Sequence, residues 1–503
     1  MYFKKIGHFA ICVVLLCCCM LFTTTQAMAA FSYRLENQED GSQIAVLTKY
    51  TGSDAEVTVP ETFEDAPVTE IGISAFADCT SLSCIKLPAT LKVIGTEAFN
   101  GCTSLGEIEL PDGLEELGSK VFKDSRVAKL YLPDTVEKLS SFAFDGMEAT
   151  LKELRWTAGI PKLDNSLFQD FTALQKLILP EGVTEIGSLY SSQGTFEDCY
   201  GLQQIHLPST LQTIGAHTFE NCWNLASISI PSGVTNIGDY AFSGCSKLQR
   251  FEMKSGSAVL CEYAFDNCVD LTKVDLGGIS KIEPYAFNMC SALTSITLPA
   301  GVKEVGQYAF YRCNKLQSIE IPEGSAKLCN SAFSGNYWLE KADLRGVSVI
   351  EGTAFYSCSR LKEVQLGEGL KTLGSGAFTN CVQLKRLYLP DDITKIEGMP
   401  HSYGSTTLVA RKGTTTASKL RAYSISFVEP VVLQLPADIK QIDAEAFCGS
   451  AAEAVVIPEG CFSIGARAFA DMPSLHYVVV PESVTKIAED AFEGSPVMCF
   501  DQE

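Results

Sequence analysis

The chain has 503 residues, which is long for a single compact hydrophobic core. It carries 39 Lys and Arg against 60 Asp and Glu, a formal net charge of −21. This acidic balance argues against nucleic acid and against anionic membrane surfaces as partners, because both are bound through basic faces. Solubility is the simplest explanation of the charge.

The N-terminus has the pattern of an export signal. Two lysines precede an apolar run over residues 6–22, and an Ala-Met-Ala sequence ending at Ala29 fits the small-x-small cleavage pattern. We expect a signal peptide over residues 1–29, cleaved after Ala29. An uncleaved anchor is the competing interpretation, which the Thr-Thr-Thr-Gln break and the Ala-rich end disfavour. No other apolar run approaches the length of a membrane span, so we expect no membrane insertion after cleavage.

Residues 30–70 do not carry the pattern that follows. Two segments, 31–35 and 43–47, alternate apolar and polar residues around a Glu-Asp-Gly-Ser turn, which predicts a β-hairpin. The first coil of a repeat array needs something to cover its open face. We therefore interpret residues 30–70 as an N-terminal hairpin cap.

One phrase recurs throughout residues 71–398. Each unit has a short strand before a Pro, then a second short strand before a Gly, and then Ala-Phe-x-x-Cys-x-x-Leu, whose apolar positions would share one face of a helical turn. Consecutive Phe anchors are mostly 22 or 23 residues apart, and a period in the twenties indicates a solenoid. The extra residues 188–194 should loop out. The anchors are Phe76, Phe99, Phe122, Phe144, Phe168, Phe196, Phe219, Phe242, Phe265, Phe287, Phe310, Phe333, Phe355 and Phe378.

Cysteine follows the anchor at a fixed distance in many units. Among the 20 cysteines, many lie three residues after the Phe, but Met147 and Phe171 take the same place elsewhere. A site that accepts Met and Phe is an apolar packing site, where Cys acts as a small hydrophobe. Equivalent side chains in adjacent coils point the same way at about 4.8 Å, whereas a disulfide needs converging Cβ atoms at about 3.8 Å. We predict mostly free, buried thiols, and neither a metal site nor a cofactor, because metal sites need clustered ligands.

The repeat lapses after Ile396. Residues 406–411 and 425–428 predict strands around a short helix over 414–423, so we interpret 399–430 as a non-repeat closing segment. The interval between Phe378 and Phe447 equals three periods, which leaves degenerate repeats as an alternative. Three further repeats occupy 431–503, the C-terminal repeats.

The repeat phrase resembles the BspA-like (Treponema-type) leucine-rich repeats, and the 407–428 stretch resembles closing segments of such proteins. The resemblance implies an α/β repeat solenoid, a leucine-rich-repeat horseshoe with a parallel β-sheet on its concave face and short strands and helical turns elsewhere. It also implies a bacterial secreted or cell-surface protein whose usual role is adhesion or protein binding. The matching positions in one unit are Ile94-Gly95, Ala98-Phe99, Cys102, Leu105, Ile108 and Leu110-Pro111.

No catalytic motif stands out in the sequence. There is no Gly-x-Ser-x-Gly elbow, no phosphate-binding Gly-rich loop and no His-Glu-x-x-His. The repeats supply no evident nucleophile, metal site or stacked aromatic platform. We therefore expect no enzymatic activity and no catalytic residues, and a carbohydrate-binding module is less favoured.

The middle residue of each first strand should point outward and form a column that varies from coil to coil. Its N-terminal half mixes Tyr and Arg, which are favoured at interface hot spots, and its middle part is acidic. Fourteen strands would make a ladder on the order of 65 Å long, suited to a protein surface rather than a small-molecule pocket. An ordinary solvated sheet face is the alternative. The candidate binding residues are Tyr131, Arg155, Ile178, His206, Glu252, Asp275, Glu320, Asp343 and Tyr388.

The sequence thus predicts a non-enzymatic exported protein that binds an extracellular or host protein through its concave face. A structural, self-assembling cell-surface protein is the alternative hypothesis.

Overall fold

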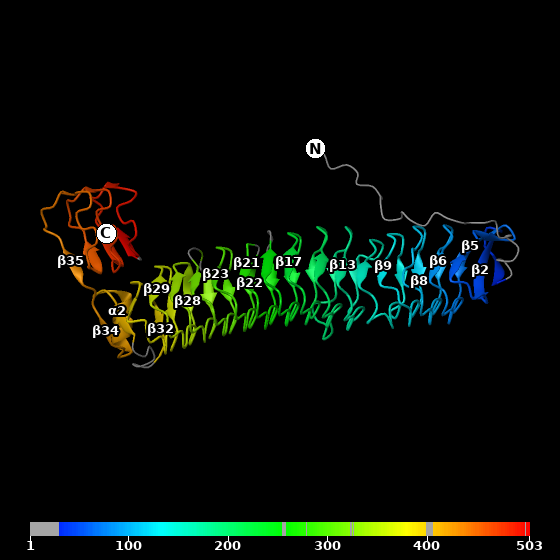
Figure 1. Cartoon of the computed structure of the whole chain (residues 1–503). Coiled ribbons are helices and arrows are strands. Elements are labelled where there is room, and N and C mark those ends of the chain that lie inside the picture. The colour runs from blue at the N-terminus through cyan, green and yellow to red at the C-terminus, as the bar shows by residue number, and fades with distance from the viewer. Residues whose placement is uncertain are drawn as a thin grey trace.

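The computed structural model describes residues 30–502 apart from 254–257, 278, 322, 323, 325, 399–405 and 498. The predicted signal peptide over 1–29 lies outside the described residues, as does the beginning of the segment predicted over 399–430. Figure 1 shows a long, gently bent stack of coils with a smaller group of coils at its C-terminal end. No helix in the described ranges has the length and apolar character needed to cross a membrane.

Nearly every coil of the long stack contributes a short strand to a first ladder of parallel strands. The coil between β6 and β9 contributes only an isolated bridge, from Glu107 to Lys129. In the strands as observed, the middle side chain is buried and the two beside it point outward. In β9, for example, Leu130 is buried and Lys129 and Tyr131 are exposed. This alternation has the period of two that a strand imposes. The first ladder comprises β3 (Glu56–Thr58), β6 (Cys84–Lys86), β9 (Lys129–Tyr131), β11 (Glu153–Arg155), β13 (Lys176–Ile178), β15 (Gln204–His206), β17 (Ser227–Ile230), β19 (Arg250–Met253), β21 (Lys273–Asp275), β23 (Ser295–Thr297), β25 (Ser318–Glu320), β27 (Lys341–Leu344), β29 (Glu363–Leu366) and β31 (Arg386–Tyr388).

A second strand in each coil builds a second parallel ladder. Its strands are mostly two residues long, with one outward and one buried side chain, as in Glu185 and Ile186. The second ladder comprises β5 (Ala66–Ile71), β7 (Val93–Ile94), β8 (Glu116–Leu117), β10 (Lys138–Leu139), β12 (Lys162–Leu163), β14 (Glu185–Ile186), β16 (Thr213–Ile214), β18 (Asn236–Ile237), β20 (Ala258–Leu260), β22 (Ile279–Ile282), β24 (Glu304–Val305), β26 (Ala326–Leu328), β28 (Val347–Ile350), β30 (Thr372–Leu373) and β32 (Lys395–Ile396).

The first ladder is interrupted, although the repeat solenoid of parallel strands is confirmed. Its strands pair within separate groups that break between β6 and β9, β15 and β17, β21 and β23, and β29 and β31, whereas the second ladder is continuous from β12 to β32. The single ladder of fourteen strands expected for the candidate binding face is therefore wrong within the described residues. The coils on either side of the β21–β23 break stay joined through the second ladder. There β22 pairs with β24, with Lys281 opposite Glu304 in the strand register.

The third side of each coil is a run of turns, and the helical turn predicted there is wrong. In one coil Glu97 and Gly101 have left-handed φ angles of 57° and 74°. The N–H of Phe99, between them, donates to the carbonyl of Val121 in the next coil at 2.9 Å. A helix would direct these N–H groups back within its own segment. The alternating backbone instead directs every second N–H along the stack, so all three sides of the coil bond to their neighbours.

The anchor phenylalanines form a column inside the stack, in which each ring stacks on the next from Phe144 to Phe378. Phe287, Phe310 and Phe333 are fully buried, and their ring centroids follow at 5.0 Å with interplanar angles of 8° and 1°. Such offset stacking adds a favourable aromatic contact to the burial of each ring. The column therefore sets the spacing of the coils.

The cysteine after each anchor both packs and donates a hydrogen bond. The thiol of Cys102 lies 3.2 Å from the carbonyl oxygen of Phe76 in the preceding coil, and the same contact recurs in later coils. Where Asn336 replaces the Cys, its side-chain amide donates to the carbonyl of Phe310 at 2.9 Å. Cysteine is thus more than the small hydrophobe expected from the sequence, because it satisfies a turn carbonyl. Burial raises the pKa of Cys102 to about 12.

The N-terminal residues cover the first coil of the stack. Strands β1 (Phe31–Asn37) and β2 (Gln43–Tyr50) pair antiparallel, β2 joins β5, and β4 (Thr62–Phe63) also pairs with β5. Phe31 packs edge-on against Phe63 at 6.0 Å, and Tyr50 stacks on Phe76 at 5.3 Å. In most later coils the preceding anchor ring covers this face of the phenylalanine. At Phe76, the first anchor, the rings of the N-terminal residues cover it instead.

The opposite end of the long stack is covered by a segment with a different shape. Strand β33 (Thr407–Val409) pairs with β31 and with β34 (Phe427–Val428). Between them runs α2 (Thr415–Ala422), the one helix in the described ranges. Its N-cap is Thr414, whose side chain accepts a hydrogen bond from the N–H of Ala417. Ala417 and Leu420 are buried, so the helix stands where a coil would have its turns.

The last residues form a second, shorter stack of coils, which we call the C-terminal block. One ladder comprises β35 (Val432–Gln434), β37 (Ala454–Val456), β39 (Tyr477–Val480) and β41 (Cys499–Gln502), and the other comprises β36 (Gln441–Ile442), β38 (Ser463–Ile464) and β40 (Lys486–Ile487). Its core forms a hydrophobic cluster separate from that of the long stack.

Glu453 joins the C-terminal block to the long stack. This carboxylate is 6% exposed and accepts from the guanidinium of Arg386 and the hydroxyl of Tyr388, both at 2.9 Å. It also accepts from the N–H of Val431 at 2.8 Å. Beside it, the hydroxyl of Tyr477 lies 2.7 and 3.0 Å from two main-chain carbonyl oxygens of the long stack. A buried carboxylate with this many donors holds the two stacks in one arrangement.

Replacing Phe310 with Ala should destabilise the long stack by about 3–5 kcal/mol, because it opens a cavity where a fully buried ring is stacked on both sides. Thermal unfolding followed by circular dichroism measures the change. Asn314→Ala, on the exposed side of the same turn, is the matched control and should change stability by less than about 0.5 kcal/mol. Equal melting of the two variants would contradict the column's role.

The thiols of the native protein should fall into two reactive classes. Cys84 and Cys448 are exposed, whereas Cys102 and Cys313 are buried and burial raises the pKa of each thiol to about 12. Because the thiolate is the reactive form, we expect alkylation at pH 8 to label the first pair rapidly and the second only after unfolding. Peptide mass spectrometry reads both. Non-reducing peptides joined through the buried positions would overturn the assignment of free thiols.

Glu453→Ala should loosen the C-terminal block, because it leaves Arg386 and the Tyr388 hydroxyl without their acceptor at a cost of about 1–3 kcal/mol. Limited proteolysis near residue 430 should become faster, while the melting of the long stack stays unchanged. Glu459→Ala, exposed on the same block, should leave the cleavage rate as it is. Unchanged proteolysis in Glu453→Ala would show that the contact does not hold the block.

Candidate functional site

Four of the predicted binding residues lie side by side on the first ladder. Arg155 is directly opposite Tyr131 on one side and Ile178 on the other, and Ile178 is opposite His206. Tyr131 is 46% exposed, His206 is exposed, and Arg155 and Ile178 are half-buried. Strands β9, β11, β13 and β15 thus present these side chains as one outward column.

A second outward column runs beside the first and was missed from the sequence. It holds Lys129, Glu153 and Lys176, each two residues before a member of the first column, and the ammonium of Lys176 lies 2.5 Å from the carboxylate of Glu153. The strand period of two was the signal that could have found it, since residues two apart share a face. The face is therefore two residues wide.

Glu153 also controls Tyr131. Burial, a hydrogen bond with Glu153 and the charge of that carboxylate together raise the pKa of Tyr131 to about 12. Burial opposes ionisation of Glu153 itself, but hydrogen bonds from Lys176 and Tyr131 outweigh it and lower the pKa of Glu153. Tyr131 thus stays a neutral phenol near pH 7, beside the carboxylate of Glu153 and with its ring at the surface.

Arg155 is occupied within the protein. Its guanidinium donates to the carbonyl of Leu132 at 2.8 Å and to both carboxylate oxygens of Asp134 at 3.0 and 3.1 Å. The same carboxylate accepts from the N–H of Ala158 at 3.0 Å. Arg155 therefore ties two coils together, and a charge reversal there would disturb the coil as well as any binding.

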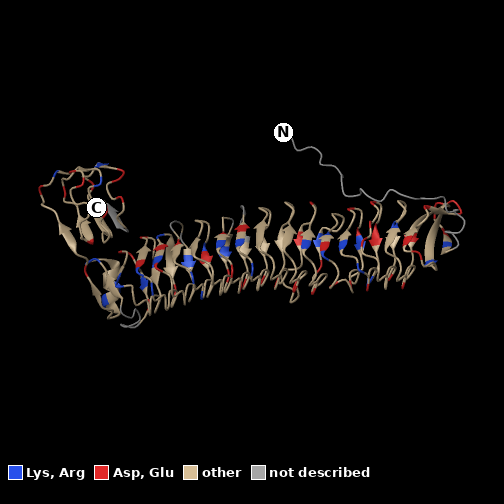
Figure 2. Ribbon diagram, viewed as in Figure 1, with Lys and Arg blue, Asp and Glu red and all other residues tan. Residues whose placement is uncertain are grey.

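The acidic half of the column is partly neutralised. Glu252 lies opposite Asp275, and Glu320 lies opposite Asp343. Arginines on the same strands or turns pair with two of them: Arg250 with Glu252 at 2.8 Å, and Arg345 with Asp343 at 2.6 Å. Figure 2 shows acidic and basic residues intermixed along the strands. No uniformly acidic face results.

A hollow of about 390 Å³ lies on the strand face where the first ladder breaks between β21 and β23. Its lining includes Lys273, Asp275, Ser295 and Thr297. The sequence gives no sign of this hollow, because it arises from the separation of two coils that keep the ordinary repeat.

Tyr388, predicted as part of the outward column, is buried. It is 8% exposed, its hydroxyl donates to Glu453, and its ring stacks on His476 at a centroid distance of 3.6 Å. Burial lowers the pKa of His476, so this ring stays neutral near pH 7. The position points outward from its strand as expected, but the C-terminal block covers it. Tyr388 is an internal contact and not a binding residue.

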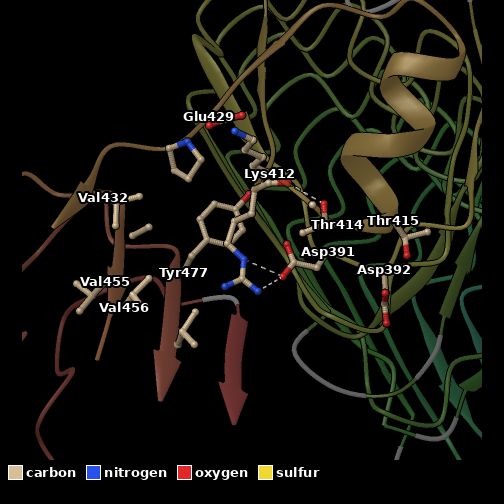
Figure 3. Close-up of a pocket in the computed structure, with 15 residues that line it drawn as sticks. Asp391, Asp392, Lys412, Thr414, Thr415, Glu429, Val432, Val455, Val456 and Tyr477 are labelled. Atoms are coloured by element: carbon tan, nitrogen blue, oxygen red, sulfur yellow. Dashed lines mark hydrogen bonds and ion pairs between the residues drawn. The ribbon is translucent and has the colours of Figure 1, made fainter. Parts of the chain in front are cut away.

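The junction between the closing segment and the C-terminal block encloses a hollow of about 580 Å³. Figure 3 shows valines of the C-terminal block on one wall and the start of α2 on the other. Arg411 is part of the lining; it pairs with Asp391, and its guanidinium lies over the ring of Tyr477 at 6.0 Å. One of the two cations in the lining is therefore already neutralised.

The turns carry a stack of aromatic rings that the sequence analysis did not expect. His217, Tyr240, Tyr263, Tyr285 and Tyr308 follow one another with centroid distances of 4.7–5.0 Å. All five are half-buried. Within the row, neighbouring rings cover one another's faces. The row therefore joins the turns of successive coils.

The described part of the chain contains no group of three or more His, Cys, Asp or Glu residues placed to hold a metal ion. What the first ladder offers is a surface of Tyr, Arg, Ile and His side chains suited to contact with another macromolecule.

Comparison with known proteins identifies the repeat. The family description "BspA type Leucine rich repeat region (6 copies)" matches residues 69–192, 188–292, 280–406 and 414–499. A search of curated proteins finds no match.

Several solved structures match this chain, and three of them come from bacteria. A leucine-rich repeat protein from Bacteroides ovatus is 20% identical, with 94% of this chain and 98% of that chain covered and a TM-score of 0.42. A leucine rich cell surface protein from Faecalibacterium prausnitzii is 24% identical, with 73% and 93% covered and a TM-score of 0.30. The pneumococcal vaccine antigen PcpA is 17% identical, with 81% and 98% covered and a TM-score of 0.31.

The family match covers both stacks of coils, from the second ladder's early strands to the last turns of the C-terminal block. The chain belongs to the BspA-type leucine-rich repeat family.

Proposed function

We propose that this protein is a non-enzymatic, exported bacterial protein that binds an extracellular protein, as an adhesin does, through the outward face of the first ladder. The carrying observation is the register of Tyr131, Arg155, Ile178 and His206 on four adjacent strands. Tyr and Arg are enriched at interface hot spots. The signal-like N-terminus supports a secreted or cell-surface location.

The surrounding contacts support a preformed binding face. Asp134 holds Arg155 through two hydrogen bonds, and Lys176 holds Glu153 beside Tyr131, so the charged side chains of this face are already ordered. Binding a partner then costs less side-chain entropy than it would with free rotors. The four strands span roughly 15–20 Å, so a partner with a standard interface of about 800 Å² must extend over further coils.

Replacing Tyr131 and Ile178 with Ala should reduce partner capture at least about tenfold, because it removes the exposed ring and the apolar side chain at the centre of the column. The measurement is quantitative capture of extracellular proteins and glycans by residues 30–503, followed by mass spectrometry. Arg155 is left in place, because its contacts with Asp134 serve the fold.

The matched control replaces Thr297 and Gln365, on distant strands of the same ladder, with Ala. A protein that the wild type and the control retain, and the double variant loses at unchanged melting temperature, supports the proposal. Equal capture by all three proteins places the binding site elsewhere. If a glycan and not a protein is retained, the proposed protein partner is wrong and the partner is a carbohydrate.

A further inference from the structure

The turns carry a charge pattern that the strand face lacks. We define the turn face as the outward side chains of the eight-residue turns that begin at the anchors from Phe196 to Phe378. The turn at Phe287 has no charged residue. The four turns before it carry five acidic residues and one basic residue: Glu197, Asp198, Glu220, Lys247, Asp266 and Asp270. The four turns after it carry five basic residues and one acidic residue: Arg312, Lys315, Glu340, Arg360, Lys362 and Lys385.

The basic half is unusual in a protein of net charge −21. Arg312 and Lys315 are exposed, and neither forms an ion pair within the described ranges. Arg360 lies over the ring of Trp338 at 3.7 Å, also with no acidic partner among the described residues. Unpaired guanidinium groups beside an exposed Trp make a surface suited to an acidic partner.

We propose that the turn face binds the turn face of a second copy of this chain, antiparallel, with the two-fold axis at the turn that begins at Phe287. A two-fold interface requires a surface that complements itself under rotation. The acidic and basic halves lie on opposite sides of one uncharged turn, so an antiparallel copy places each half against the other. The anchors on both sides follow at 5.0–5.7 Å, so four coils cover similar lengths in each direction.

The charges match turn by turn in this arrangement. Counting outward from Phe287, every charged turn of one copy meets a turn of opposite charge in the other copy. This also holds for the second turns out, where the acidic half carries its one basic residue and the basic half its one acidic residue. The facing pairs are Arg312 and Lys315 with Asp266 and Asp270, Glu340 with Lys247, Arg360 and Lys362 with Glu220, and Lys385 with Glu197 and Asp198. Within one chain Lys362 already lies 3.4 Å from Glu340, and Glu220 pairs with His217, so these side chains would share their partners in the dimer.

The exposed apolar side chains fit the same register. Met289 is 43% exposed in the central turn and would meet its own copy on the axis. Trp338, 49% exposed, faces the turn of Lys247, and Trp223, 48% exposed, faces the turn of Arg360. Each tryptophan thus meets a cation of the second copy, which is the favourable arrangement for the face of an indole ring.

The size of the surface sets the expected strength. Eight steps of about 5 Å give a strip roughly 40 Å long, and a width of about 10 Å gives about 400 Å² per copy. This is half of a standard interface, so we expect a dimer with a dissociation constant in the micromolar range or weaker. The C-terminal block leaves the turn face free, because it docks through Arg386 and Tyr388 of the first ladder.

The dimer is independent of the binding function proposed above, because it uses a different side of the coils. Its test is sedimentation velocity of residues 30–503 from roughly micromolar to several hundred micromolar in about 0.15 M salt. We expect concentration-dependent dimers that dissociate in about 1 M salt, where charges are screened beyond about 3 Å. A chain that stays monomeric throughout overturns the proposal.

Charge exchange tests the register. Arg312→Glu, Lys315→Glu and Arg360→Glu together should weaken self-association at least about tenfold, and so should Glu220→Lys with Asp270→Lys. An equimolar mixture of the two variants should form a heterodimer, because in one contact the introduced glutamates of the first variant face the introduced lysines of the second, and the other contact keeps its native charges. Failure of the mixture to associate overturns the antiparallel arrangement.

A control variant separates the turn face from the effect of net charge. Lys49→Glu, Lys86→Glu and Lys303→Glu change the charge by the same amount at exposed sites outside the turn face. This variant should dimerise nearly as the wild type does. Equal loss of dimer in the control and in the turn-face variant would contradict the proposed contact, and circular dichroism confirms that all variants remain folded.

Discussion

Every coil of this protein depends on contact with the coil beside it. On the strand sides the main chain bonds to neighbouring strands, and on the turn side alternating left-handed residues direct the N–H groups along the stack. The phenylalanine column runs through the centre at a repeat of about 5 Å. No coil can satisfy its backbone or bury its ring alone, which explains why the long stack is covered at one end by a hairpin and at the other by α2 and its flanking strands.

This dependence separates the scaffold from the surface. The inward positions are confined to Phe, Cys, Leu and Ile because each must fit between two neighbours. The outward positions are free to differ, and they do so in two ways. The first ladder has mixed charges around Tyr131 and Arg155, whereas the turn face divides into an acidic and a basic half. One array can therefore offer two unrelated surfaces for recognition.

Several details of the scaffold could not be predicted from the repeat. The spacing of Phe, Cys and Leu fits a helical turn and a run of non-helical turns equally well, because both place the same residues inward. The choice depends on whether the N–H groups bond within the segment or to the next coil. Cysteine likewise looked like a packing residue, since its acceptor, the carbonyl of the preceding coil's Phe, is distant in sequence.

The sequence by itself determined the solenoid, its period, its inward residues and the outward column with Tyr131, Arg155, Ile178 and His206, because a period of 22 or 23 residues and a strand period of two are local properties. Only the tertiary structure decided which outward residues are free. Tyr388 has the same local pattern as Tyr131, yet Glu453 and His476 cover it. The breaks in the first ladder and the facing halves of the turn face also depend on how whole coils stack, since no single repeat records what its neighbours place beside it.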